Sequence, residues 1–381
     1  MRVFSLERRH SAFRLLGALA LCLAALAGPV RAEIVVASVW TLQSSLNRQA
    51  LDLAIEKINA GGGLLGQTVR LVSFDEGCND EQGALVARMV LRQSPSLVVG
   101  HQCSGPAITA APTYAAAGVV QIAPNATSPR LTEMGIATVF RLVGRDDRQG
   151  AAAADRIARE WPKARIGLIE DDSVYGTALA ASVRRELDRV GIDAVDSFPI
   201  RVRSRRSAEI LAAVRRDNLN LVYFACNYSQ DIGMLVRGLA AIPGLTILAG
   251  DAAIDLGDSV SRYLVDIPFY YTFFPDLSAS PKVRALFAEG QARGVAFTDR
   301  TLRAYVAIEL WAEAVRRAGS LDAARVAEVL HRDRFDTELG EVSFDAKGDV
   351  RGAPAEWAWR RLGVPAPRHV SEAAEDAAKG D

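Results

Sequence analysis

Residues 96–129, SLVVGHQCSGPAITAAPTYAAAGVVQIAPNATSP, decide how this chain folds. Two short apolar runs, residues 97–100 and 119–122, have the composition of buried parallel strands. Small polar residues follow each run, with Ser104 after the first and Thr127 after the second. Ligands bind at the carboxyl edge of an open parallel sheet, so this stretch predicts a site that offers hydrogen bonds to a small ligand.

Strand and helix signals alternate along the chain in two successive blocks. Strands are expected at residues 34–40, 68–74, 97–100, 119–122, 165–169, 194–199, 220–225 and 245–250, and helices at residues 45–60, 80–93, 105–117, 151–160, 176–190, 207–216, 230–239, 302–317 and 321–331. Alternating βα units predict parallel sheets covered on both faces. With 381 residues, too many for one ordinary core, the chain is predicted to be an α/β protein of two doubly wound lobes.

The overall charge argues against two classes of partner. Apolar residues make up 50% of the chain and charged residues 24%, and the formal net charge is zero. A balanced charge does not favour binding to nucleic acid or to an anionic membrane surface. We therefore expect no nucleic-acid partner, and we expect a monomer.

The N-terminus has the pattern of an export signal. Arginines precede an apolar run, residues 15–26, that is too short to span a bilayer, and a small-x-small site ends at Ala32. Residues 1–32 are therefore predicted to be a signal peptide that is removed in the periplasm. A lipid anchor at Cys22 is the alternative, although the residue before it is not the small one that a lipobox has.

Three cysteines follow the predicted cleavage site. Because an exported protein meets an oxidising compartment, a disulfide between Cys78 and Cys103 is predicted, and two free buried thiols are the alternative. Cys226 is left over and is expected to be a buried free thiol.

The sequence lacks the patterns typical of enzymes and cofactor sites. None of the four histidines is spaced with another histidine or a cysteine as a metal-ligand pair, and no phosphate-binding or dinucleotide-binding glycine motif occurs. A triad of Ser104, His101 and Asp251 is conceivable, but the first two are three residues apart on one loop, which gives poor nucleophile–base geometry. We expect a protein without catalytic activity, cofactor or metal.

The polar residues of the first block suit a carboxylate. Ser104, Asn125, Ala126 and Thr127 lie at strand ends, and their hydroxyl and backbone N–H groups lie near helix starts. Ordinary N-capping by the two hydroxyl residues is the alternative, and it is compatible with ligand binding.

Residues at the strand ends of the second block form the other half of the predicted site. Tyr175 opens a helix, Tyr228 follows the strand at residues 220–225, and Asp251 follows the strand at residues 245–250. Opposite a carboxylate site, Asp251 is a natural partner for an ammonium group, and a helix N-cap is its alternative role. Trp40 ends the first strand, where it forms either an aromatic wall of the site or the edge of the core.

At these residues the chain resembles the leucine/isoleucine/valine-binding protein family, the type I periplasmic solute-binding components of branched-chain amino-acid ABC importers. The resemblance covers nearly all of the mature chain, and its most specific motifs are at residues 58–66, 78–104, 126–132, 147–150, 175–176 and 344–349. It implies two lobes joined by a three-stranded hinge near residues 141–145, 271–275 and 349–353. The implied lobes are residues 33–143 plus 274–351 and residues 144–273 plus 352–367. Residues 368–381 lack aromatic residues and are rich in Ala, Glu and Asp, and this composition predicts a disordered tail.

The resemblance also implies a role for each site residue. Ser104, Thr127 and the backbone at Asn125 would hold the ligand carboxylate, and Asp251 would receive the ammonium, where the closest family members have Glu. Tyr175 and Tyr228 would be the aromatic residues of the second lobe.

The segment after Trp40 departs from the family pattern, because it is shorter and lacks the usual Gly-Pro loop. The expected function is delivery of a small amino acid, branched-chain or otherwise hydrophobic, to a membrane ABC permease. An aromatic acid or amide as the ligand, or a periplasmic sensory receptor of the same fold, are the alternatives.

Overall fold

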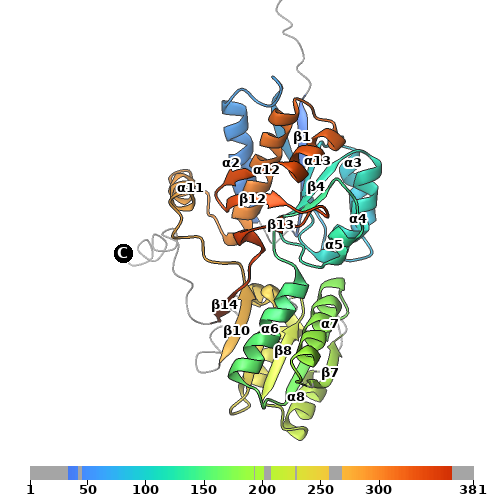
Figure 1. Cartoon of the computed structure of the whole chain (residues 1–381), viewed down its shortest axis with the longest axis vertical. Helices are drawn as coiled ribbons and strands as arrows, with labels where there is room; N and C mark the ends of the chain where they lie inside the picture. Colours follow the sequence, from blue (N-terminus) through green and yellow to red (C-terminus); the bar gives the residue numbers. More distant parts are fainter. Residues whose placement is uncertain are drawn as a thin grey trace, which may run out of the picture.

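The structure consists of two α/β lobes stacked along the long axis of the molecule (Figure 1). It is a computed structural model that describes residues 33–41, 45–192, 194–200, 207–227, 230–256 and 268–362. The predicted signal peptide, the tail and Tyr228 lie outside the described residues.

The first lobe is built on a parallel sheet with the strand order β2-β1-β3-β4-β5. The strands are β1 (Ile34–Trp40), β2 (Val69–Asp75), β3 (Leu97–Gly100), β4 (Val120–Ala123) and β5 (Val139–Arg141). The central strands β1, β3 and β4 are buried along their whole length, which explains why their sequences are mostly apolar.

Helices cover both faces of the first sheet. They are α2 (Ser45–Ala60), α3 (Gly83–Leu91), α4 (Ser104–Ala116), α5 (Arg130–Glu133), α11 (Pro281–Ala292), α12 (Asp299–Ala318) and α13 (Ala323–Arg332). Residues of α2 and α12 pack in one core cluster, and residues of α3 and α4 pack in another on the opposite face. A small antiparallel sheet of β11 (Phe335–Thr337), β12 (Gly340–Phe344) and β13 (Val350–Arg351) completes the lobe.

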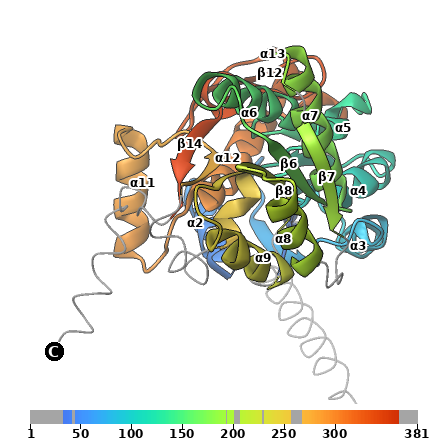
Figure 2. The same cartoon turned by 90° about the horizontal axis from the view of Figure 1, so that it is seen from below.

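The second lobe has a six-stranded sheet with the order β14-β10-β9-β8-β6-β7, in which only β14 is antiparallel to its neighbour. Its elements are β6 (Ile166–Asp171), β7 (Ala194–Ile200), β8 (Leu221–Ala225), β9 (Thr246–Ala249), β10 (Phe269–Phe273), β14 (Ala358–Arg361), α6 (Asp146–Glu160), α7 (Val174–Arg189), α8 (Ser207–Arg216), α9 (Gln230–Ala240) and the short 3-10 helices η1 (Asp251–Leu256) and η2 (Ala353–Ala355). Figure 2 shows α6 and α9 on opposite faces of this sheet.

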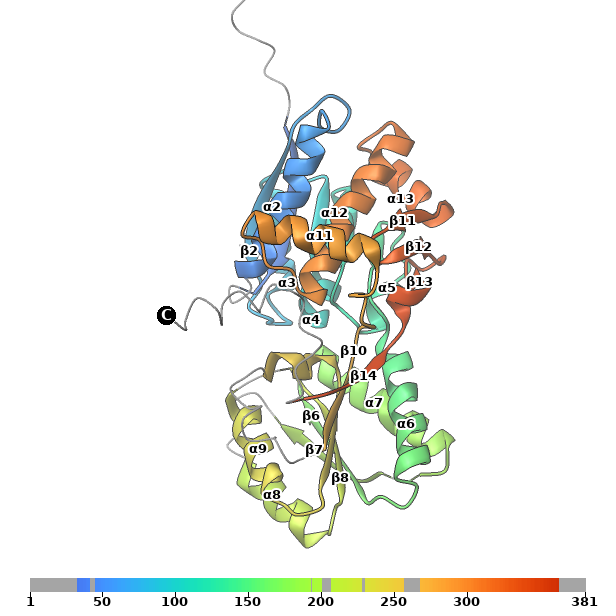
Figure 3. The ribbon, with the colours of Figure 1, turned by 90° about the vertical axis from the view of Figure 1, so that its left-hand side faces the viewer.

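The described chain passes between the two large sheets three times. It does so between β5 and α6, between β10 and α11, and between β13 and β14. Two contacts tie these passages together: a parallel bridge between Arg141 and Asp349, and the antiparallel pair β10–β14. Figure 3 shows β10 and β14 running from one lobe towards the other. The predicted fold of two doubly wound α/β lobes is confirmed.

Some element boundaries differ from the prediction. Helix α6 begins at Asp146 and α12 at Asp299, each earlier than expected, because their first turns are polar and outside the apolar pattern. Strands β5 and β14 are short, and helix α11 lacks a clear apolar stripe, so neither kind of element was predicted. Within the described ranges, no helix is both long and apolar enough to cross a membrane.

Candidate functional site

The carboxyl ends of the two parallel sheets face each other. Asp80 follows β2 and its Oδ2 accepts a hydrogen bond of 2.8 Å from the backbone N–H of Val174, which follows β6. The carbonyl of Thr127, after β4, accepts one of 3.0 Å from the N–H of Asp146 at the start of α6. Residues at these strand ends therefore lie between the lobes, as the sequence predicts.

The predicted carboxylate residues of the first lobe lie together. Ser104 is the buried first residue of α4, and its Oγ accepts a hydrogen bond of 3.2 Å from the N–H of Ser128. This bond joins Ser104 to the turn formed by residues 125–128. Neither predicted hydroxyl is a helix N-cap, because Cys103 and Pro129 occupy the caps of α4 and α5.

The buried side chain of Arg141 anchors this turn through hydrogen bonds to its backbone. The Arg141 guanidinium donates to the carbonyl of Ser128 at 2.7 Å and to that of Ala126 at 3.3 Å. Its Nε donates to Asp349 Oδ1 at 2.7 Å, so the positive charge is paired. The shape of the turn thus depends on residues brought together from two distant parts of the chain.

Several polar atoms around this turn are buried without a partner. They include Asn125 Oδ1 and Ser128 Oγ, which have no hydrogen bond to another described residue. The Thr127 hydroxyl is also buried and faces the Asp146 carboxyl. Buried polar groups in native proteins are nearly always paired. Unpaired buried polar atoms beside a turn whose backbone is held in place are the features that a binding site for a polar ligand group requires.

The predicted ammonium partner, Asp251, is buried at the start of η1. Its Oδ1 accepts hydrogen bonds from the Tyr175 hydroxyl at 2.9 Å and from Gln149 Nε2 at 3.1 Å. Its backbone N–H donates to Gln149 Oε1 at 2.9 Å. The structure therefore brings Asp251 and Tyr175 together.

A second carboxyl group, on Asp146, lies beside Asp251 and was missed by sequence reasoning. Gln149 Nε2 donates to Asp146 Oδ1 at 3.1 Å and so links the two acids. Burial raises the pKa of Asp146 well above its ordinary value, and the Asp251 carboxyl adds to this effect. Burial also raises the pKa of Asp251, although the positive charge of Arg300 opposes the rise. A ligand cation at this position would favour the ionised form of both carboxyl groups.

Trp40 is packed as part of the core of the first lobe. Its side chain is 5% exposed and belongs to the cluster that includes α2 and α12. The edge-of-core interpretation therefore describes its position. Residues 42–44, which follow it, lie outside the described residues, so its role as an aromatic wall stays a prediction.

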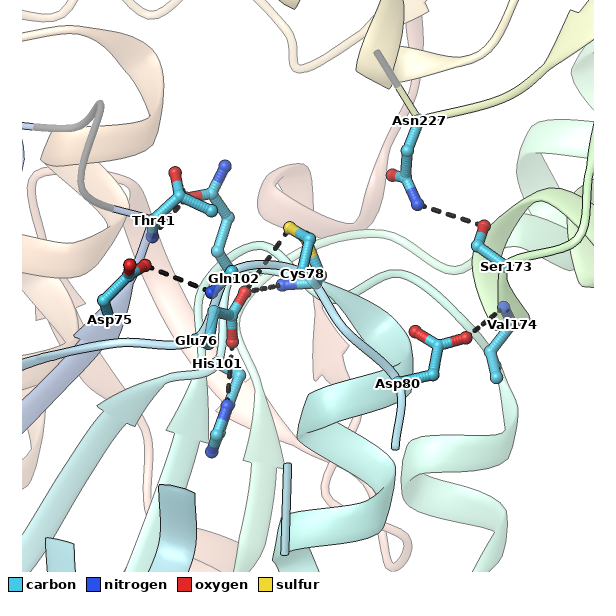
Figure 4. The surroundings of a disulfide bond; sticks show 12 residues. Thr41, Asp75, Glu76, Cys78, Asp80, His101, Gln102, Ser173, Val174 and Asn227 are labelled. Carbon is cyan, nitrogen blue, oxygen red and sulfur yellow. Dashed lines mark hydrogen bonds and ion pairs between the residues drawn. A yellow bond between two sulfur atoms is a disulfide. The ribbon is translucent and has the colours of Figure 1, made fainter. Parts of the chain in front are cut away.

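The strand ends beside Tyr175 are organised by Asp171. Its Oδ2 accepts a hydrogen bond of 2.6 Å from the N–H of Asn227, and its Oδ1 accepts one of 3.1 Å from the N–H of Ser173. Asn227 Nδ2 in turn donates to Ser173 Oγ at 3.0 Å (Figure 4). Burial raises the pKa of Asp171 to about 6. These bonds join the segment before Tyr175 to the end of β8.

The predicted disulfide between Cys78 and Cys103 is present, with a Cα–Cα distance of 5.4 Å. Beneath it, Glu76 Oε1 accepts a hydrogen bond of 2.7 Å from the N–H of Cys103, and Glu76 Oε2 lies 2.8 Å from His101 Nδ1. The other nitrogen of His101 lies 3.1 Å from the Tyr114 hydroxyl. Both ring nitrogens of His101 are thus engaged away from Ser104, which argues against the triad.

The remaining cysteine matches its prediction, since Cys226 is buried and free. Burial raises the pKa of its thiol well above the ordinary value. It is therefore an inert part of the second core.

Comparison with known proteins agrees with this geometry. A family model described as "Periplasmic binding protein" matches residues 41–355. The chain belongs to this family. An "Amino acid binding protein" from Pseudomonas aeruginosa is 31% identical over 78% of this periplasmic binding protein and 80% of its own length. A "Leucine-, isoleucine-, valine-, threonine-, and alanine-binding protein" from the same organism is 29% identical over 86% of each chain, so the resemblance drawn from the motifs is confirmed.

Solved structures of similar fold are also found. An ABC transporter substrate-binding protein from Desulfitobacterium hafniense, in complex with Leu, has a TM-score of 0.71 at 23% identity and covers 87% of this chain and 98% of its own. A solute-binding protein of an ABC transporter from Rhodopseudomonas palustris, in complex with p-hydroxybenzoic acid, has a TM-score of 0.74 at 17% identity and covers 87% and 93%. At these identities the likeness supports the fold of this periplasmic binding protein.

Proposed function

We propose that this chain is the extracytoplasmic solute-binding component of an ABC importer and that its ligand is a small hydrophobic amino acid. The observation that carries the proposal is that the two lobes present chemically different surfaces to each other. Unpaired hydrogen-bonding atoms surround the turn at residues 125–128 of the first lobe, and a buried acid pair, Asp146 and Asp251, lies in the second. A zwitterion matches both faces at once.

In this proposal each head group has its own partner. The ligand carboxylate binds Ser104, Thr127 and the backbone at Asn125, where N–H and O–H donors suit an anion. The ammonium binds Asp251, which Tyr175 and Gln149 hold in place. Tyr228 and Trp40 contribute to the pocket for the ligand side chain. No chemical step is involved, in keeping with the binding proteins among the relatives.

Transport follows from closing the two lobes around the ligand. We propose lobes of residues 33–143 plus 274–351 and residues 144–273 plus 352–367, rotating about the three passages between the sheets. Closure would bury the ligand and present one surface made of both lobes to the membrane permease. Export through a signal peptide at residues 1–32 would place the mature monomer in the periplasm.

A thermal-shift screen tests the ligand class. The purified mature protein is heated with leucine, isoleucine, valine, threonine, alanine, phenylalanine or p-hydroxybenzoate. A ligand at 100 times its dissociation constant stabilises the protein by about 2.7 kcal/mol, which raises the melting temperature visibly. We expect a shift with hydrophobic amino acids. A shift with p-hydroxybenzoate alone would instead support the aromatic-acid alternative.

A further inference from the structure

A carboxylate of the first lobe reaches into the second lobe beside the proposed site. Asp80 lies between β2 and α3, and its Oδ2 accepts a hydrogen bond of 2.8 Å from the N–H of Val174, the first residue of α7 (Figure 4). The first N–H groups of a helix have no partner within the helix and carry partial positive charge. Asp80 therefore satisfies one of these donors from the opposite lobe.

The first lobe holds Asp80 rigidly in this position. Its backbone carbonyl accepts a hydrogen bond of 3.0 Å from the Thr109 hydroxyl of α4. Gly105, also in α4, leaves room for the side chain, because a Cβ atom there would lie 1.8 Å from Asp80 Oδ1. The Cys78–Cys103 disulfide fixes the same loop to the start of α4. Asp80 is thus presented to α7 by structure that exists within one lobe.

An apolar contact accompanies the hydrogen bond. Val174 packs against a cluster of the first lobe that includes Ala107, Ile108 and Ala126. Its neighbour in sequence, Tyr175, donates its hydroxyl to Asp251 in the proposed ligand site. Two consecutive residues of α7 therefore connect the interlobe contact to the residue that would receive the ligand ammonium.

We propose that Asp80 and Val174 form an interlobe latch that sets ligand affinity by stabilising the closed arrangement of the lobes, without touching the ligand. The apparent affinity of a protein that binds in one conformation scales with the population of that conformation. Asp80 is thus a positioning residue. Its effect on ligand affinity rests on the proposed function, whereas its effect on the closure of the lobes does not. The carboxylates of Glu81 and Asp172 also act on Asp80, but both are exposed, so solvent and salt screen their charge.

The test measures closure directly, without any ligand. Dyes are attached to cysteines introduced at Leu85 of α3 and Met234 of α9, whose side chains are 51% and 62% exposed. These helices lie on the side of the molecule away from β10 and β14 (Figure 3). The native cysteines do not interfere, because two are bonded and Cys226 is buried. Single-molecule energy transfer then reports the separation of the lobes.

We expect Asp80→Ala to shift the free protein towards the low-transfer, open population and to weaken leucine binding about 5- to 30-fold, through faster dissociation. Saturating leucine should restore the high-transfer state, since a defect in folding would not be rescued in this way. The matched control, Glu81→Ala, removes the same charge from the exposed neighbouring residue and should change neither readout.

Two results separate the latch from the proposed function. Transfer distributions that are identical for Asp80→Ala and Glu81→Ala would overturn the latch, whatever the ligand. If leucine does not bind the native protein but Asp80→Ala still opens it, the latch stands and the amino-acid proposal fails. If Asp80→Ala is unstable, Asp80→Asn keeps the side-chain volume and should produce a smaller shift in the same direction. No shift in the folded amide variant together with unchanged leucine affinity would contradict the proposal.

Discussion

The two lobes present different groups at the proposed site. In the first lobe, Arg141 anchors the backbone of the turn at residues 125–128, while Asn125 Oδ1 and Ser128 Oγ are left without a partner among the described residues. In the second lobe, Asp251 already accepts hydrogen bonds from Tyr175 and Gln149. The first lobe therefore has vacant hydrogen-bonding positions on a fixed frame, and the second has a self-contained acidic network. We infer that a ligand gains most of its hydrogen bonds in the first lobe and its charge compensation in the second.

The largest expected effect on stability comes from replacing Arg141, which anchors the turn at residues 125–128 of the first lobe. Arg141→Met removes one of the two arginines that pair with the buried Asp349, the other being Arg145, and frees the carbonyls of Ala126 and Ser128. Arg145 still pairs with Asp349, so the loss comes mainly from the buried carbonyls, at about 1–3 kcal/mol for each one left without a hydrogen bond. Urea unfolding measures this loss. Arg351→Met, at an exposed position, is the control and should change stability by less than about 0.5 kcal/mol. Equal effects from both variants would show that Arg141 does not anchor the turn.

The disulfide gives the next largest effect. Replacing both Cys78 and Cys103 by Ser removes a crosslink between residues that are 25 positions apart. The chain-entropy model predicts a loss of about 3.5 kcal/mol in the free energy of unfolding. Dithiothreitol should lower the native protein to the level of the double variant and leave the variant unchanged. Resistance of the native protein to the reductant, with a fully stable double variant, would contradict this expectation.

Replacing Thr127 tests the effect of its hydroxyl on ligand binding separately from its effect on stability. Thr127→Val keeps the shape of the side chain but removes a buried hydroxyl whose neighbour is the Asp146 carboxyl. We expect leucine affinity to fall roughly 10- to 150-fold, the equivalent of one hydrogen bond to a charged group, with little change in unfolding. Thr138→Val makes the same change at a buried hydroxyl without a partner that lies at the amino end of β5, whereas Thr127 follows the carboxyl end of β4. Its calorimetric titration should match that of the native protein. An equal loss in both variants would place the ligand elsewhere.

Glu309 of α12, away from both faces of the site, gives the smallest effect. Burial, reinforced by the neighbouring Glu338 carboxylate, raises its pKa to about 7. A carboxyl whose pKa is higher in the folded state stabilises the fold most at low pH, and this stability is lost as pH rises through 7. We expect the native free energy of unfolding to fall by about 1–3 kcal/mol between pH 5 and 8, and Glu309→Gln to flatten that slope. Glu313→Gln, one turn along the helix, should leave the slope as it is.

The fold and half of the site follow from local sequence patterns. Alternating apolar runs and amphipathic segments are sufficient to predict both sheets. The positions of the strand ends are sufficient to predict that four residues lie between the lobes: Ser104, Thr127, Tyr175 and Asp251. The short strands β5 and β14 are not predictable in this way, because too few residues carry their pattern.

The supporting residues depend on contacts between distant segments. Arg141 pairs with Asp349, 208 positions away, and Gln149 with Asp251, 102 positions away. No local pattern encodes these pairs. Asp146 had a weak signal, since it stands in an acidic doublet at a helix start, but such doublets are usually exposed. Its burial follows from the way Thr127 and Gln149 enclose it.

The central claim is that the site recognises a zwitterion, and calorimetric titration with leucine and two truncated analogues tests it most directly. One analogue, 4-methylpentanoic acid, lacks the ammonium, and the other, 3-methylbutylamine, lacks the carboxylate. We expect the native protein to bind leucine and to bind each analogue at least about 100-fold more weakly. In Asp251→Ala, binding of leucine should be lost while the weak binding of 4-methylpentanoic acid is retained. If the native protein binds 4-methylpentanoic acid as tightly as leucine, the account of the acidic second lobe is wrong.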